Sequence, residues 1–294
     1  MHANEFKISS ILVKNLLLQQ FPQWVDLDLV ALKPEGTDNV MYKLGGDKVV
    51  RLPRIEIAVP SLEKEILWLP KLASKLPIPV PKLIGVGDPS IEYPYPWFVY
   101  KLLEGSPIGE INILDKEQAA VDLGQFIIAM QNVKYRNSPM CRRGKPLSNR
   151  NQETREAINL SKDYFDDKLL TQLWDFVLKT PAWEGDPVWI HGDLHPGNLL
   201  VKDGRISAVL DFGLCGIGDP AADLMVAWTV LDKDSRKRFR SIVKPEDATW
   251  NRGYGWALAL GIVGYSYYRE RNPSFALIAK RTLDEVLSDQ IMSD

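Results

Sequence analysis

The segment between Ile190 and Gly213 holds a set of side chains whose types and spacing could do chemistry. Asp193 and Asn198 are separated by four residues, and Asp211 opens the tripeptide Asp-Phe-Gly further along. A carboxylate can orient an attacking hydroxyl, whereas a carboxamide and a second carboxylate supply oxygen ligands for Mg²⁺. Phosphoryl transfer requires these groups in this order, because it asks a protein mainly for positioning and charge neutralisation. We predict Asp193 as catalytic base, and Asn198 and Asp211 as Mg²⁺ ligands.

Each of these residues, taken alone, also has a purely structural interpretation. Asp193 and the neighbouring His191 and His195 could cap a turn, and Asp211 could cap a helix. A hydrolase-type metal site of His and Asp is a second alternative, but the chain has three histidines in all and Asn198 would be unexplained. The joint order and spacing favour phosphoryl transfer. His191 is expected to structure the loop, and the role of His195 stays open.

A predicted hairpin upstream carries groups that a nucleotide could use. Two β-prone runs within residues 40–52 are joined by Gly-Gly-Asp, which indicates a hairpin. Gly36 and Asn39 precede the first run and are the best candidates for a phosphate cradle, although a plain turn is the alternative. Arg51 lies on the second run, where its guanidinium could bind the α- and β-phosphates. Glu65, on the predicted helix that follows, is its expected partner, and Glu63 on the same helix is the alternative.

The hydrophobic pattern divides the chain into two predicted domains. A buried strand at residues 97–100 ends at a Glu-Gly-Ser-Pro run, and we place the boundary there. An N-terminal nucleotide-binding lobe would cover residues 1–103, and a C-terminal catalytic and acceptor-binding lobe residues 104–294. Lys101 and Leu103 would form the connection that binds the base of ATP or GTP. The C-terminal spacing is mainly helical, so the predicted fold class is α+β.

Composition and charge exclude several classes of function. The 36 basic and 38 acidic side chains give a formal net charge of −2, which does not support binding to nucleic acid or to a membrane surface. Cys141 and Cys215 lack zinc-site spacing and are expected to be reduced thiols. The N-terminus lacks the order of a signal peptide, and the apolar run 256–268 is too short to span a bilayer. A cytoplasmic protein is expected.

The chain resembles the aminoglycoside phosphotransferase family, a branch of the protein-kinase-like fold. The motifs that carry the resemblance are GTDNVMYKL, VVRLPR, KEILWLPKLA, LPIPVPKLIG, HGDLHPGN, AVLDFG and GDPAADL, in the family's order. The proline-punctuated run is similar to the 2″-acting aminoglycoside kinases, and macrolide kinases share the pattern at residues 51–54. The resemblance implies a bilobal fold, Mg²⁺-dependent transfer of the γ-phosphoryl group of ATP or GTP, and a small hydroxylated acceptor. Arg51 stands at the position where the family usually has a lysine.

The sequence leaves the acceptor open. A polycationic aminoglycoside would need a carboxylate-lined cleft, whereas a macrolide would need an aromatic pocket. The carboxylates considered are Asp163, Asp166, Asp167, Asp223, Glu246 and Asp247. The tryptophans considered are Trp174, Trp183, Trp189, Trp228, Trp250 and Trp256. An antibiotic is the first expectation, a sugar or amino alcohol in a metabolic kinase the second. A silent nucleotide-binding module is disfavoured, because it has no need of all three catalytic groups.

Overall fold

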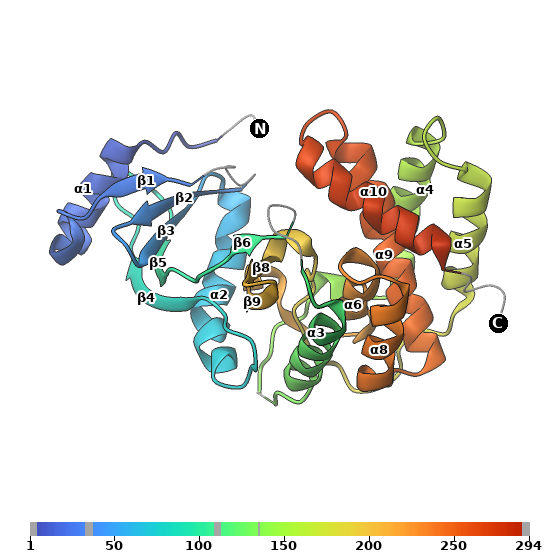
Figure 1. Cartoon of the computed structure of the whole chain (residues 1–294). Helices are drawn as coiled ribbons and strands as arrows, with labels where there is room; N and C mark the ends of the chain where they lie inside the picture. The colour runs from blue at the N-terminus through green and yellow to red at the C-terminus, as the bar shows by residue number, and fades with distance from the viewer. Residues whose placement is uncertain (1–4, 33–37, 109–112, 135, 290–294) are drawn as a thin grey trace. The chain divides into compact units, whose positions relative to one another are not determined.

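The computed structural model describes residues 5–32, 38–108, 113–134 and 136–289. It forms two compact units, one of residues 1–75 and 79–104 and one of residues 76–78 and 105–294. Strands dominate the first unit and helices the second (Figure 1). Among the described residues, no helix is both long and apolar enough to cross a membrane.

The first unit is built on a five-stranded antiparallel sheet in the order β1-β2-β3-β5-β4. The strands are β1 Leu29–Ala31, β2 Asn39–Leu44, β3 Lys48–Pro53, β4 Lys82–Gly87 and β5 Trp97–Lys101. Alternate residues of β2 are buried, so one face of this strand packs into the core. The predicted hairpin between β2 and β3 is confirmed, and Gly45 takes the positive φ of +59° that its turn needs.

Two helices accompany this sheet. Helix α1, Ser10–Gln20, begins at an N-cap in which the Ser9 side chain accepts a hydrogen bond from the Leu12 N–H. Its buried residues join the apolar face of β2 and β3 in one core cluster. Helix α2, Val59–Ala73, carries Glu65 on its buried side. It packs against β4, a strand that the proline-rich sequence before it did not predict.

The second unit is mainly helical. Its helices are α3 Lys116–Gln131, α4 Asn151–Leu160, α5 Asp167–Lys179, α6 Ala221–Leu224, α7 Val226–Thr229, α8 Lys233–Val243, α9 Asp247–Tyr268 and α10 Pro273–Ser288. Helix α9, which contains the apolar run 256–268, is largely buried and packs against α4, α5, α6 and α10. Residues 221–231 contain two short helices that are separated at Met225.

Short strands frame the loop that contains Asp193. They are β6 Ser106–Pro107, β7 Val188–Ile190, β8 Leu199–Lys202, β9 Arg205–Val209 and β10 Gly216–Gly218. Strands β6, β8 and β9 form one antiparallel sheet, and β7 pairs with β10 in another. The loop therefore starts on one small sheet and ends on the other, which fixes both of its ends.

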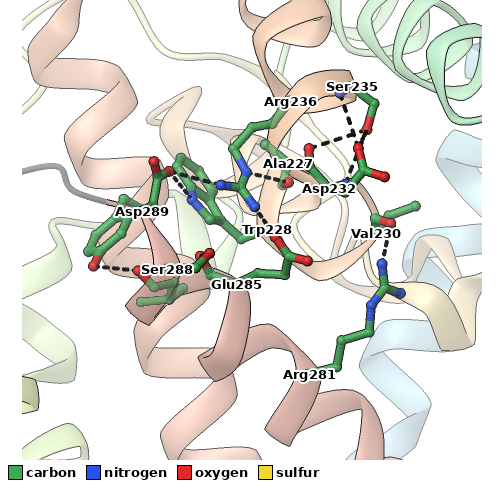
Figure 2. Close-up of polar contacts among 12 residues, drawn as sticks. Ala227, Trp228, Val230, Asp232, Ser235, Arg236, Arg281, Glu285, Ser288 and Asp289 are labelled. Atoms are coloured by element: carbon green, nitrogen blue, oxygen red, sulfur yellow. Dashed lines mark hydrogen bonds and ion pairs between the residues drawn. The ribbon is translucent and has the colours of Figure 1, made fainter.

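A buried arginine fastens α8 to the C-terminal helix α10 (Figure 2). Arg236, whose side chain is 4% exposed, forms ion pairs with Glu285 and with Asp289, the latter at 3.0 Å. Its Nε donates to the Ala227 carbonyl at 3.0 Å, and the Trp228 indole donates to Asp289 at 2.8 Å. Because a buried charge is tolerated only when it is paired, this cluster fixes how α7, α8 and α10 pack.

Candidate active site

Asp193 and Asn198 are in direct contact within the loop between β7 and β8. The Asn198 Nδ2 donates to the Asp193 carbonyl at 2.9 Å and to its Oδ2 at 3.2 Å. The other carboxylate oxygen, Oδ1, forms an ion pair with Arg143. Burial acts to raise the pKa of Asp193, but attraction to Arg143 and then to His195 outweighs it and holds the pKa well below its ordinary value. Asp193 is therefore an ionised acceptor of hydrogen bonds.

The β8–β9 pairing places Asn198 and Asp211 at the same end of a hairpin. Leu199 pairs with Val209, and one step further the Leu210 N–H donates to the Asn198 carbonyl at 2.8 Å. Asp211 adopts a left-handed φ of +58° at the start of a single 3₁₀ turn. Since the Asn198 nitrogen is bonded to Asp193, its amide oxygen is the atom that could bind a cation.

This donor set fits Mg²⁺ better than Zn²⁺. It consists of one amide and one carboxylate, and Mg²⁺ binds through few protein oxygens while keeping waters and substrate phosphates. In the part of the chain that the structure describes, no cluster of three or more His, Cys, Asp or Glu could hold a metal ion. The hydrolase-type site considered from the sequence is therefore absent from those residues.

Asp223, a buried carboxylate of α6, holds the start of the loop between β7 and β8. The two oxygens of Asp223 accept the backbone N–H groups of His191 and Gly192, both at 2.7 Å. Burial raises the pKa of Asp223 to about 7, against the lowering effect of these two hydrogen bonds. Gly192 has a φ of +79°, and a Cβ there would lie 2.6 Å from the Cys141 sulfur. The loop backbone consequently has little freedom at this point.

His191 holds the other side of the loop as a neutral imidazole. Its Nδ1 accepts the Asp193 N–H at 3.2 Å, and its Nε2 lies 2.9 Å from the Leu210 carbonyl, to which it donates in this tautomer. The ring is fully buried and packs edge-on against Phe212. Burial lowers the pKa of His191 and so opposes its protonation.

This environment makes stability depend on pH. The unfolded chain binds a proton at His191 as pH falls through about 6.5, whereas the folded chain, with its lowered pKa, resists it. The free energy of unfolding should therefore drop below that pH, by at most about 1.4 kcal/mol per pH unit for one proton. Urea titrations of the wild type and His191→Gln at several pH values measure the difference. A difference in the free energy of unfolding between the two proteins that stays constant from pH 8 to 5 would contradict the lowered pKa of His191.

The residues after the Asp-Phe-Gly turn are held by a second buried charge pair. The Asp219 carboxylate accepts Nε of Arg252 at 2.7 Å and Nη2 at 3.1 Å, and it also caps Ala221 N. The two side chains are 5% and 4% exposed. Arg252 further donates to the Pro181 carbonyl and the Thr249 hydroxyl. Asp219 thus accepts the first backbone N–H of α6 and is also one half of a buried bidentate pair.

In the first unit, Arg51 of β3 is paired with Glu65 of α2. The Arg51 Nη1 lies 3.1 Å from each carboxylate oxygen, and the Tyr100 hydroxyl donates to Glu65 at 2.5 Å. Glu65 is buried, whereas Glu63 is exposed on the other side of the helix. A buried carboxylate with two such partners holds the guanidinium in a fixed direction.

The other residues expected to bind nucleotide are placed less completely. Gly36 lies outside the described residues. Asn39 opens β2, and its amide oxygen is buried without a hydrogen-bond partner in the described part of the chain. Lys101 ends β5 and is exposed, and the N–H that follows it, on Leu102, donates to the Asp47 carbonyl at 2.7 Å. A nucleotide base at this connection would have to use groups of Lys101 or Leu103 instead.

The structure places the two residue sets considered from sequence for the acceptor in several different environments. Of the six tryptophans, all but Trp183 are buried in the core. Among the carboxylates, Asp223 lies under the loop, Asp166 caps α5, and Asp247 is paired with Arg240. The remaining three, Asp163, Asp167 and Glu246, are exposed.

A chain of aromatic contacts leads away from the loop instead. The His195 ring, whose Nε2 lies 3.7 Å from Asp193, packs against Phe275 at a centroid distance of 5.5 Å. Phe275 contacts Tyr268 at 4.6 Å, and Tyr268 contacts Tyr267 at 4.8 Å. Tyr267 is 49% exposed. Aromatic contacts therefore connect His195, beside the candidate base, to an exposed ring near the end of α9.

Comparisons with known proteins show the family of this chain. Residues 31–260 match the model of the phosphotransferase enzyme family. An aminoglycoside 3′-phosphotransferase of Escherichia coli is 36% identical over 62 residues, 21% of this chain and 23% of that protein. One from Enterococcus faecalis is 43% identical over 53 residues, 18% of this chain and 20% of that protein. The chain thus spans less than a quarter of the length of these curated relatives.

Solved structures match over nearly the whole chain. The GDP complex of an aminoglycoside 2′-phosphotransferase IIIa covers 95% of this chain and 98% of its own, with a TM-score of 0.72 and 19% identity. A macrolide 2′-phosphotransferase from Brachybacterium faecium covers 92% and 96%, with a TM-score of 0.62 and 22% identity. The predicted protein-kinase-like α+β fold is confirmed.

Proposed function

The chain belongs to the phosphotransferase enzyme family, and we propose that it transfers the γ-phosphoryl group of ATP or GTP to a hydroxyl of a small molecule. The observation that carries the proposal is the ionised Asp193 held by Asn198, with Asp211 at the neighbouring strand end. This is the set of groups that phosphoryl transfer needs.

Asp193 would act on the acceptor. The acceptor hydroxyl donates a hydrogen bond to the carboxylate, which aims its oxygen at the γ-phosphorus. The new oxygen–phosphorus bond forms as the bond to the bridging oxygen breaks, the nucleoside diphosphate leaves with that electron pair, and the proton passes to Asp193. A carboxylate with a low pKa is a weak base, so its main contribution is orientation. Magnesium held by Asn198 and Asp211 would neutralise phosphate charge.

An aminoglycoside is the first acceptor to test, because the curated relatives are named as aminoglycoside phosphotransferases. A second candidate is an acceptor with an apolar face, such as a macrolide or an uncharged glycoside. The aromatic chain from His195 to Tyr267 supports it, since sugar and lactone faces pack well on rings. The guanidinium of Arg271, 4.4 Å from the Tyr267 ring centre, adds positive charge that a polycation would avoid.

An acceptor panel tests this function. Purified protein is incubated with Mg-ATP and Mg-GTP in parallel against aminoglycosides, macrolides, sugars and amino alcohols. Acceptor-dependent release of ADP or GDP, with a phosphate monoester on the acceptor by phosphorus NMR, is the expected result. Nucleotide binding without turnover of any acceptor would contradict the proposal and favour a silent module.

Arg51 is expected to carry much of the nucleotide affinity. Arg51→Met removes the guanidinium while keeping the length of the side chain, and hydrogen bonds to charged phosphates contribute about 1.5–3 kcal/mol. The dissociation constant for Mg-ATP or Mg-GTP should rise by about ten- to a hundredfold, as measured by calorimetry. Arg54→Met is the matched control, because Arg54 lies on the same segment but pairs with Glu5 at 3.6 Å. Equal nucleotide affinity in the wild type and Arg51→Met would show that Arg51 does not bind the nucleotide.

A further inference from the structure

Residues 139–144 are built onto β10, although their sequence is that of a polar loop. The Ile217 N–H donates to the Pro139 carbonyl at 2.8 Å, and the Cys141 N–H donates to the Ile217 carbonyl at 3.0 Å. At the far end, the Asp219 N–H donates to the Gly144 carbonyl at 3.0 Å. These bonds hold the segment at both ends of the strand.

Close packing of glycines fixes the segment further. A Cβ on Gly144 would lie 2.7 Å from the Cα of Gly218, and one on Gly216 would lie 2.6 Å from the Pro139 carbonyl oxygen. Backbone groups that approach this closely leave no room for side chains and little room for movement. The backbone at Arg143 is therefore held in a fixed position.

The guanidinium of Arg143 contacts the loop between β7 and β8 that contains Asp193. Its Nη1 donates to the Gly192 carbonyl at 2.9 Å and forms the ion pair with Asp193 Oδ1. The Arg143 and Asp193 side chains are 24% and 18% exposed, so water only partly screens the pair. The neighbouring Arg142 is exposed, and no hydrogen bond or ion pair of its side chain occurs within the described ranges.

We propose that Arg143 is a positioning residue that fixes the Asp193 carboxylate in the direction needed to orient the acceptor hydroxyl, which rests on the function proposed above. The carboxylate is held on one oxygen by Arg143 and on the other by Asn198. Each oxygen keeps a second lone pair, so the clamp sets the direction of the carboxylate without using up its capacity to accept a hydroxyl. Both contacts come from the one Nη1 atom of Arg143, so a lysine ammonium, which also carries several N–H donors on one nitrogen, could reproduce part of the clamp.

Kinetics of Arg143 variants test the role. Arg143→Ala should lower kcat by about 10²-fold, the typical cost of a misplaced reacting group, while nucleotide affinity and the acceptor KM change less than about threefold. Arg143→Lys should restore part of kcat, and Arg142→Ala should match the wild type. In an Asp193→Asn background, Arg143→Ala should have little further effect, because the two residues act as a unit. Wild-type kcat in Arg143→Ala, or equal losses in Arg142→Ala, would overturn the proposal.

A second measurement separates this inference from the proposed function. Crystal structures of the wild type and Arg143→Gln are compared at the Asp193 side chain, whether or not an acceptor has been found. We expect the carboxylate to rotate or to occupy more than one conformation in the variant. An Asp193 carboxylate that keeps its single orientation would overturn the inference, whereas failure of the wild type to phosphorylate any acceptor would overturn only the function.

Discussion

Asp193→Asn should lower kcat by about 10²- to 10⁴-fold, the usual contribution of a positioned acid or base. The amide keeps the shape of the side chain but cannot take the proton of the acceptor hydroxyl, and it carries no charge to pair with Arg143. Nucleotide affinity should change little, because Asp193 contacts Asn198 through its carboxylate and carbonyl and is not itself a predicted metal ligand. Steady-state kinetics together with calorimetry of Mg-nucleotide binding measure both effects.

Two further variants, a surface control and a predicted metal ligand, show whether the loss of turnover is specific to Asp193. Asp203→Asn is the control, because Asp203 lies in the β8–β9 turn with a φ of +52° that asparagine accepts equally well. Asp211→Asn should lose turnover and also weaken Mg-nucleotide binding, as a metal ligand would. Equal losses of binding in Asp193→Asn and Asp211→Asn would show that the role of Asp193 is misassigned.

Arg252→Met should destabilise the second unit by about 3–5 kcal/mol, the usual cost of leaving one partner of a buried ion pair alone. The variant strands the Asp219 carboxylate, which is 5% exposed, and removes donors to Pro181 and Thr249. At about 2–4 °C per kcal/mol for a chain of this size, Tm should fall by roughly 10 °C. Thermal unfolding followed by tryptophan fluorescence is weighted toward this unit, because it contains six of the nine tryptophans.

The exposed pair Lys280–Asp284 on α10 is the matched control for that prediction. Its side chains are 52% and 55% exposed and lie 2.8 Å apart, so Lys280→Met should cost no more than about 0.5 kcal/mol. Replacing both partners in Asp219→Leu/Arg252→Met should cost less than Arg252→Met alone, since no charge is then left buried. A Tm in Arg252→Met equal to that of Lys280→Met would contradict the structural role of the pair.

Much of the fold follows from local sequence signals. The Gly-Gly-Asp turn indicated the β2–β3 hairpin, and the mainly helical spacing of the C-terminal part is matched by the helices of the second unit. Strands β1 and β4 were missed, because β1 is only three residues long and prolines precede β4. Both strands are stabilised by hydrogen bonding to a neighbouring strand, and their own sequences show no clear strand pattern.

The candidate site was predictable only where its residues are close in sequence. Asp193, Asn198 and Asp211 lie in one motif whose spacing indicates their chemistry. Arg143 contacts Asp193 from 50 residues away, and it lies outside the motifs whose spacing indicates chemistry. Asp223 reaches the loop through backbone groups, which carry no sequence signal. Such partners are brought together by tertiary packing, so no local spacing could have identified them.

Transfer of labelled phosphate in a single turnover tests the central claim most directly. Excess protein is mixed with γ-³²P nucleotide, Mg²⁺ and an acceptor, and the label is followed into the acceptor for the wild type and Asp193→Asn at matched nucleotide occupancy. We predict rapid transfer by the wild type and transfer slowed by about 10²-fold or more in the variant. Label that reaches the acceptor at the same rate in both proteins would contradict the assignment of Asp193.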